Sequence, residues 1–468
     1  MSHKCTRREF LESGTAGVVV LSALGGPRSA VPVSAALPSL PLVRVRVIFL
    51  AKPKPTWPTP HLDVEAECRR VDAELRKVAR EVPDVELTGG DLLRVSDDLN
   101  RLKGTMEGVD GVLVFNLTST VGHLVSGITD YGIPTILFSQ PFSGHDWCQV
   151  ADMQREGKRI DVMATSDFGE LARGLRAFRT VRRLKDARIL CITGGGLDQN
   201  FASQVKQRFG TTIMLVGAEQ LMETYNTADE SGSEKLAREV SNDAEKTVEP
   251  SAEEIKKSCR LYYAMRNMLE QEKAQAIAIN CLGLFAQNRL PAYPCIGFSR
   301  LNDEGLVGAC EADLYSTLTM LTFGYLVERP GFISDPVIDT SKGTVLHAHC
   351  VSATKMGGVN AERCPYVIRS HMEDDKGAAL QVRMHIGQKI TMARYLGTDT
   401  MLVSTGEIID TPVLERGCRT KITTKVADAR KVLRQYTGGL HRVIFYGDHI
   451  EDIYRLSHFL NFNVVEEC

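Results

Sequence analysis

Five side chains in the C-terminal half of the sequence combine metal-ligand and acid–base chemistry. Glu311 is predicted to lie in the first turn of a helix with apolar residues at 314, 318, 321 and 325, where a carboxylate is favoured as the anion. Such a carboxylate suits a metal ligand, and equally an ordinary helix-start residue. Asp335 follows the apolar segment 331–334, which predicts a position at a strand end, where α/β proteins build sites. An Asp before Pro336 is also a turn former.

Three histidines complete this set. His347 and His349 lie two positions apart in a predicted strand, so both imidazoles can face one centre, with a structural role as the alternative. His441 follows Gly438 and Gly439 and precedes a predicted buried strand, a junction that can place an imidazole in a cleft. Carboxylates with imidazoles form a mixed oxygen–nitrogen set, which suits Mn²⁺ and similar divalent ions better than thiolate-bound zinc.

The twelve cysteines favour a different interpretation. They form no C-x-x-C motif and fall in apolar surroundings, such as 190–192 and 294–296, where a free cysteine behaves as a small hydrophobic residue. We therefore expect most of them to be buried thiols and expect no zinc finger.

Length and composition bound the class of protein. The 468 residues indicate about three domains at roughly 150 residues each. Lys and Arg total 56 against 58 Asp and Glu, a net charge of -2 that argues against nucleic-acid binding, which needs a basic excess. The 43% hydrophobic and 24% charged content is typical of a folded, water-soluble protein.

The N-terminus predicts export. Arg7 and Arg8 form a twin-arginine pattern, an apolar stretch follows over 14–24, and small residues at 33–35 suit a signal peptidase. We interpret 1–35 as a Tat signal that sends a bacterial protein to the periplasm or outside the cell, with no membrane span after its removal. A disordered basic N-terminus is the alternative.

Two α/β domains are predicted to follow, over 42–185 and 186–330. Both contain short apolar runs separated by helical stretches, which indicate parallel strands buried on both faces in a doubly wound, Rossmann-like arrangement. The second domain carries Glu311. The predicted strands are 43–49, 111–115, 134–138, 188–192, 212–216, 276–279 and 294–298, with helices at 64–82 and 252–275.

Residues 331–468 show a different hydrophobic pattern. Short alternating segments predict a small antiparallel, barrel-like β-domain, closed by a strand at 442–446 and a helix that runs to about residue 460. The alternating segments are 344–351, 366–371, 380–386, 389–396, 400–404 and 421–426.

Four motifs in this order and spacing resemble the L-fucose/L-arabinose isomerase superfamily. They are Leu301-Asn302-Asp303-Glu304-Gly305, Cys310-Glu311-Ala312-Asp313, Leu346-His347-Ala348-His349 and Gly438-Gly439-Leu440-His441. The matching parts cover most of the chain after about residue 275.

The resemblance implies a Mn²⁺-dependent aldose–ketose isomerase, or one using another divalent metal, that works through an ene-diol. Glu311 matches the first carboxylate, a metal ligand and acid–base group, and Asp335 the second, with Asp339 as a nearby competitor. His349 matches a ligand of arabinose-type members, and His441 the final histidine ligand of both types. Which carboxylate is the base stays open.

The remaining candidates concern substrate and assembly. His145 and Trp147 form part of a loop suited to sugar contacts, including contacts to a neighbouring subunit's site, and a structural loop is the alternative. His347 and Arg419 complete the weaker substrate-binding set. The resemblance also implies a homo-oligomer, a trimer or hexamer, that binds a small carbohydrate.

Two departures separate this chain from fucose isomerases: it is shorter, and it is predicted to carry an export signal. Both favour a nonstandard sugar or sugar derivative. Two alternatives stay open, an exported sugar-binding protein that keeps the fold without turnover and another metal-dependent carbohydrate reaction such as epimerisation or lyase chemistry.

Overall fold

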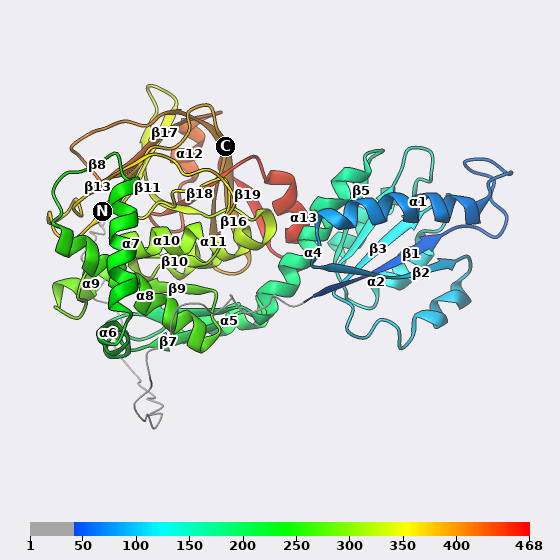
Figure 1. Ribbon diagram of the computed structural model, residues 1–468. Coiled ribbons are helices and arrows are strands. Elements are labelled where there is room, and N and C mark those ends of the chain that lie inside the picture. Colours follow the sequence, from blue (N-terminus) through cyan, green and yellow to red (C-terminus); the bar gives the residue numbers. More distant parts are fainter. Residues whose placement is uncertain (1–41) are drawn as a thin grey trace.

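The computed structural model describes residues 42–468, so the predicted signal segment, 1–35, lies outside the described residues. Within the described residues, three large sheets follow one another along the chain, and a fourth, smaller sheet is also present (Figure 1). Among the helices of the described part, none is both long and apolar enough to cross a bilayer.

The first sheet is parallel, with the strand order β2-β1-β3-β4-β5. Every residue of β3 and β4 is buried, which explains why these strands are continuous apolar runs in the sequence. The elements of this part are β1 (Val43–Leu50), α1 (Val64–Val78), β2 (Val85–Leu93), β3 (Gly111–Asn116), α2 (Gly122–Thr129), β4 (Thr135–Ser139), α3 (Val150–Arg155), β5 (Ile160–Ala164) and α4 (Leu171–Asp186).

The second sheet is also parallel, with the order β10-β9-β6-β7. Its elements are β6 (Arg188–Ile192), α5 (Gln199–Phe209), β7 (Thr212–Val216), α6 (Ala218–Asn226), α7 (Glu230–Asp243), α8 (Ala252–Glu272), β9 (Ala276–Ile279), α9 (Cys281–Ala286), α10 (Cys295–Asp303), β10 (Val307–Ala309) and α11 (Leu314–Val327).

The strand predicted over 294–298 is wrong, because this segment begins helix α10. Residues 295–299 are all buried, so the sequence shows no polar face from which a helical period could be recognised. Gly297 lies against Tyr262 and Met265 of α8, and this close approach of two helices leaves no room for a Cβ.

The third system is a closed barrel of six antiparallel strands, in the order β15-β18-β11-β12-β17-β16 and back to β15. Strand β19 (Asn463–Glu466) extends it by pairing in parallel with β16. The barrel strands are β11 (Phe332–Asp339), β12 (Thr344–His349), β15 (Lys389–Leu396), β16 (Thr400–Asp410), β17 (Thr420–Val426) and β18 (Arg442–Tyr446).

The segments 366–371 and 380–386, predicted as part of the barrel-like β-domain, instead form a separate small sheet. Strands β13 (Tyr366–Arg369) and β14 (Ala379–Val382) pair with each other, and β8 (Lys246–Thr247) joins β13. Two helices complete the chain, α12 (Ala429–Gln435) and α13 (Ile450–Leu460). The predicted α/β class with a barrel-like β-domain is thus confirmed, whereas the Rossmann-like winding and the domain boundaries stay predictions.

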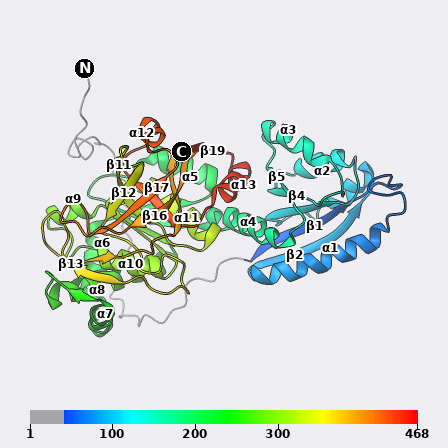
Figure 2. The same ribbon diagram turned by 90° about the horizontal axis from the view of Figure 1, so that it is seen from above.

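Helix α11 joins the second sheet to the barrel. Most of its residues are buried, and it contacts β9 and β10 on one side and β15 and β18 on the other. The first sheet and its helices lie to one side of these two systems in both views (Figures 1 and 2).

Helix α13 connects the end of the chain to that first part. Arg173 of α4 donates to Asp452 at 2.8 Å, and the rings of Phe178 and Phe459 stack with centroids 5.4 Å apart. His458 lies 3.1 Å from Asp161 of β5.

Candidate active site

The structure brings together the four residues predicted as metal ligands. The Nε2 atom of His441 lies 3.3 Å from Oδ1 of Asp335 and 3.7 Å from Oε2 of Glu311. The Nε2 atom of His349 lies 3.8 Å from Oε1 of Glu311, and the two imidazole rings are 5.5 Å apart. Residues from the second sheet, from the barrel and from the loop before β18 thus lie close together.

Strand register explains how the barrel supplies Asp335 and His441. Ser334 and Arg442 form the last pair of the β11–β18 ladder, and the same antiparallel register continued by one residue places Asp335 opposite His441. Asp335 also pairs with Ala348 of β12, which places His349 near the same end of the barrel.

Asp335 lies within β11, so the prediction that it ends a strand is wrong. The pairing with β18 covers only 332–334, and β11 continues beside β12 alone. The missing N–H of Pro336 is tolerated where one side of a strand is unpaired. The competitor Asp339 instead accepts hydrogen bonds from Ser341 and Lys342 in an exposed turn.

Glu311 comes from the second sheet, through a turn of unusual conformation. It lies in a 3₁₀ turn (Cys310–Ala312) between β10 and α11, with φ values of 57° at Glu311 and 49° at Ala312. The left-handed region costs a residue with a Cβ roughly 1–2 kcal/mol, and such strain concentrates at functional sites. The predicted position in the first helical turn is therefore wrong: the helix begins at Leu314.

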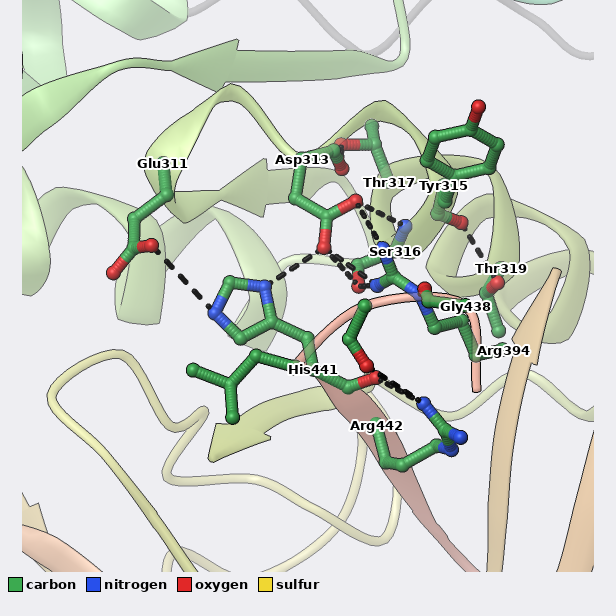
Figure 3. A network of polar contacts seen from close by, with 12 residues as sticks. Glu311, Asp313, Tyr315, Ser316, Thr317, Thr319, Arg394, Gly438, His441 and Arg442 are labelled. Carbon is green, nitrogen blue, oxygen red and sulfur yellow. Dashed lines mark hydrogen bonds and ion pairs between the residues drawn. The ribbon is translucent and has the colours of Figure 1, made fainter. Parts of the chain in front are cut away.

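Asp313 is the residue that sequence reasoning missed. Its side chain caps α11 by accepting the N–H of Ser316 at 3.0 Å, and its Oδ2 lies 2.7 Å from Nδ1 of His441 (Figure 3). This contact places the Nδ1 proton of His441 toward Asp313 and turns Nε2 toward Glu311 and Asp335. The sequence signal that could have identified Asp313 is its position as a helix-capping residue two positions after the candidate ligand Glu311.

Arg394 holds Asp313 and the loop before His441 together. Its guanidinium donates to Oδ2 of Asp313 at 2.6 Å and to the carbonyl of Gly438 at 2.7 Å (Figure 3). It lies over the ring of Tyr315, with 5.5 Å between the guanidinium carbon and the ring centroid. A buried arginine in a barrel strand requires such partners.

The charges of this network shift two pKa values. Burial acts to raise the pKa of Asp313, but Arg394 and His441 outweigh it and hold that pKa well below its usual range. Burial likewise acts to lower the pKa of His441, and the neighbouring carboxylates of Asp313 and Asp335 instead raise it to about 10.

The donor set fits a divalent cation. Within the described residues, the buried Nε2 atoms of His349 and His441 have no hydrogen bond of normal geometry, and both face carboxylates. Asp335, His349 and His441 each offer a ligand atom within 4.8 Å of the others. The Nδ1 atom of His349 accepts the N–H of Cys350, so ligation through Nε2 would require its proton to move to Nδ1 at the expense of this contact.

The other predicted residues lie elsewhere. His347 is buried between the hydroxyls of Ser334 and Thr424, each 3.1 Å away, and burial lowers its pKa to about 3. Arg419 is buried and donates to the carbonyl and hydroxyl of Ser370. Neither is in the groups that could hold a metal.

His145 and Trp147 belong to the first part of the chain. They follow β4 and precede α3, in the part that lies to one side of the barrel (Figures 1 and 2). The His145 ring lies 5.2 Å from that of Trp57, and Trp147 is 46% exposed. Their predicted sugar contacts stay untested.

Comparison with known proteins gives three informative relatives, while no family model matches. The chain is 24% identical over 410 residues to the sulfoquinovose isomerase of Alkalicoccus urumqiensis, covering 80% of this chain and 90% of that protein. It is 23% identical over 306 residues to the enzyme of the same name from Clostridium sp. (strain MSTE9), and 24% over 217 residues to that of Priestia aryabhattai. These matches cover 61% and 45% of this chain, and 66% and 48% of the two relatives.

Proposed function

We propose that this protein is an aldose–ketose isomerase that acts on a sugar derivative. The observation that carries this function is the convergence of Glu311, Asp335, His349 and His441 from distant parts of the chain. The relatives named sulfoquinovose isomerase support the same reaction, and they make sulfoquinovose the first substrate to test.

We further propose that these four residues hold Mn²⁺ or a similar divalent cation. Two carboxylates and two imidazoles are the ligand types that such ions accept. When bound, the cation supplies Lewis-acid polarisation of neighbouring sugar oxygens. Asp313 and Arg394 keep His441 in the tautomer and orientation that ligation requires.

The protein's own part in the reaction is proton transfer. One carboxylate of the pair Glu311 and Asp335 accepts the proton from C2 of the open-chain aldose, which gives an ene-diolate with its charge on O1. The hydroxyl proton passes from O2 to O1, and the proton taken from C2 is delivered to C1 to give the ketose. Positioned acid–base groups contribute about 10² to 10⁴ in rate. Both carboxylates are partly exposed, with side-chain exposures of 23% and 19%, so both can reach a substrate.

Three further proposals follow from the sequence: Tat export of the protein, a homo-oligomeric state, and sugar contacts from His145 and Trp147 across subunits. Trp147 supports the last of these, because a large aromatic ring stays exposed at the surface.

The deciding experiment measures metal content and product together. Purified protein is assayed with a panel of aldoses that includes sulfoquinovose, with and without a chelator, and the ketose is identified. We expect a divalent metal, chelator-sensitive turnover and loss of turnover in Glu311→Gln. Glu407→Gln is the matched control, because Glu407 lies exposed on β16.

Binding of sugar without turnover, unaffected by the chelator, would indicate a binding protein. A product other than the ketose would indicate a different reaction. Full activity of Glu311→Gln would contradict the assignment of this residue.

A further inference from the structure

A buried thiol lies beside the candidate metal ligands. Cys310, Glu311 and His349 each offer one ligand atom, and these sulfur, oxygen and nitrogen atoms all lie within 4.8 Å of one another. Cys310 is 4% exposed and His349 is 3% exposed, while the oxygen comes from the partly exposed Glu311. The buried Nε2 atom of His349 faces this group without a hydrogen bond in the described structure.

This trio differs in chemistry from the group of Asp335, His349 and His441 that lies next to it. The latter offers only oxygen and nitrogen, as hard divalent ions prefer, whereas Cys310 adds a soft sulfur ligand. Sulfur, nitrogen and oxygen together form a set that zinc accepts in proteins.

We propose that Cys310, Glu311 and His349 form a second cation site that selects a thiophilic divalent metal of the zinc class. The site shares His349 and Glu311 with the proposed Mn²⁺ centre, so occupation of one excludes full occupation of the other. A zinc-class ion would thus be a competitor that takes two ligands away from the first centre.

The strained turn explains how one segment serves both sites. Consecutive left-handed residues, Glu311 and Ala312, turn the chain sharply between β10 and α11. The Cys310 side chain and the Glu311 carboxylate both reach the neighbourhood of His349 from this turn. In an ordinary α-helix, with 3.6 residues per turn, two consecutive side chains point about 100° apart. The left-handed turn differs from this, and both side chains reach His349.

A neighbouring thiol completes the surroundings. The Sγ atom of Cys281, at the start of α9, lies 3.0 Å from that of Cys310, and both cysteines are free and buried. Binding replaces the Cys310 S–H bond with a sulfur–metal bond, and the thiol proton leaves to solvent. The charge therefore balances without an oxidant or reductant.

Cobalt(II) provides a direct probe, because a thiolate ligand gives it a near-ultraviolet charge-transfer band that oxygen and nitrogen ligands do not give. We expect this band when Co²⁺ is added to the metal-free full-length protein, with a phosphine reductant keeping thiols reduced. The band should be lost in Cys310→Ser and kept in Cys191→Ala, a control in which another buried cysteine is removed from β6. Excess Mn²⁺ should reduce the band by competition.

Zinc affinity, measured by competition with a chromophoric chelator, gives a second readout. The Cys310→Ser variant lacks the thiolate ligand, so it should bind Zn²⁺ at least about tenfold more weakly than the wild-type protein. Its Mn²⁺ affinity should change by less than about threefold, because Mn²⁺ prefers oxygen ligands.

The proposal is overturned if Co²⁺ gives no thiolate band with the wild-type protein, or if Cys310→Ser keeps both the band and its zinc affinity. The wild-type spectrum decides the matter even where the variant fails to fold. Ketose formation with Mn²⁺ is measured separately, so failure of this site is distinguishable from failure of the proposed function.

Discussion

The Nδ1 atom of His441 lies 2.7 Å from Oδ2 of Asp313, and this pair links the barrel to the start of helix α11. A carboxylate on the far nitrogen of an imidazole fixes the tautomer and orients the other nitrogen for a ligand. Arg394 neutralises Asp313 and ties it to Gly438. His441 is therefore prepared for ligation by its surroundings, whereas His349 has its Nδ1 occupied as an acceptor.

Asp313→Asn should weaken Mn²⁺ binding by about 10- to 100-fold, because the amide does not favour the required tautomer. Calorimetric titration with Mn²⁺ measures this effect. Asp428→Asn is the control, since Asp428 also caps a helix, α12, but lies away from the candidate ligands. Equal losses in both variants would show that Asp313 acts only as a helix cap.

Asp335→Asn should abolish turnover and weaken metal binding, whereas Asp339→Asn should keep both. The two residues share strand β11, but only Asp335 faces His441, at 3.3 Å. Asp339 holds an exposed turn. Steady-state kinetics and metal titration of both variants check the assignment, and an inactive Asp339→Asn with a normal Asp335→Asn would reverse it.

Metal affinity should rise with pH. Burial opposes the charged form of His441, but Asp313 and Asp335 raise its pKa to about 10, so the imidazole is protonated at neutral pH. A cation must displace the Nε2 proton, and the apparent affinity should rise about tenfold per pH unit between about pH 6 and 9. Titration calorimetry in buffers of different ionisation enthalpy should show about one proton released, and a pH-independent affinity would contradict this linkage.

Glu467→Gln should destabilise the fold by about 3–5 kcal/mol, because it leaves the charge of Arg442 buried without its partner. The two side chains are fully buried, and the guanidinium donates to Glu467 at 2.6 and 2.9 Å. Chemical denaturation measures the loss. Glu466→Gln is the control, since that exposed residue accepts a hydrogen bond from Tyr454, and an equal loss there would argue against the role of burial.

The sequence allowed the ligand candidates to be predicted because their residue types and spacing are local features. Buried parallel strands such as β3 could also be predicted, because they are continuous apolar runs in the sequence. The cysteines at 191, 259, 281, 295, 310, 350 and 364 are buried and free, which confirms that most are buried thiols.

What the sequence did not reveal depends on packing. Helix α10 is buried on all sides at its start, which erases the helical period. The left-handed turn at Glu311 and the partnership of Asp313 with Arg394 arise only when α11 meets the barrel. Asp313 and Arg394 are 81 residues apart, and a single sequence gives no indication that two such distant positions are in contact.

Helix α13 has a consequence for the order of assembly. Its contacts with α4 and β5 join residues that are nearly 300 positions apart, such as Arg173 with Asp452 and Asp161 with His458. A ribosome delivers α13 long after the first sheet, and closing so long a loop is entropically costly and slow. The first part is therefore anchored in two steps: α4 packs on α11, where Arg179 donates to the carbonyl of Tyr325, and the contacts of α13 are added only after residues 450–460 have been synthesised.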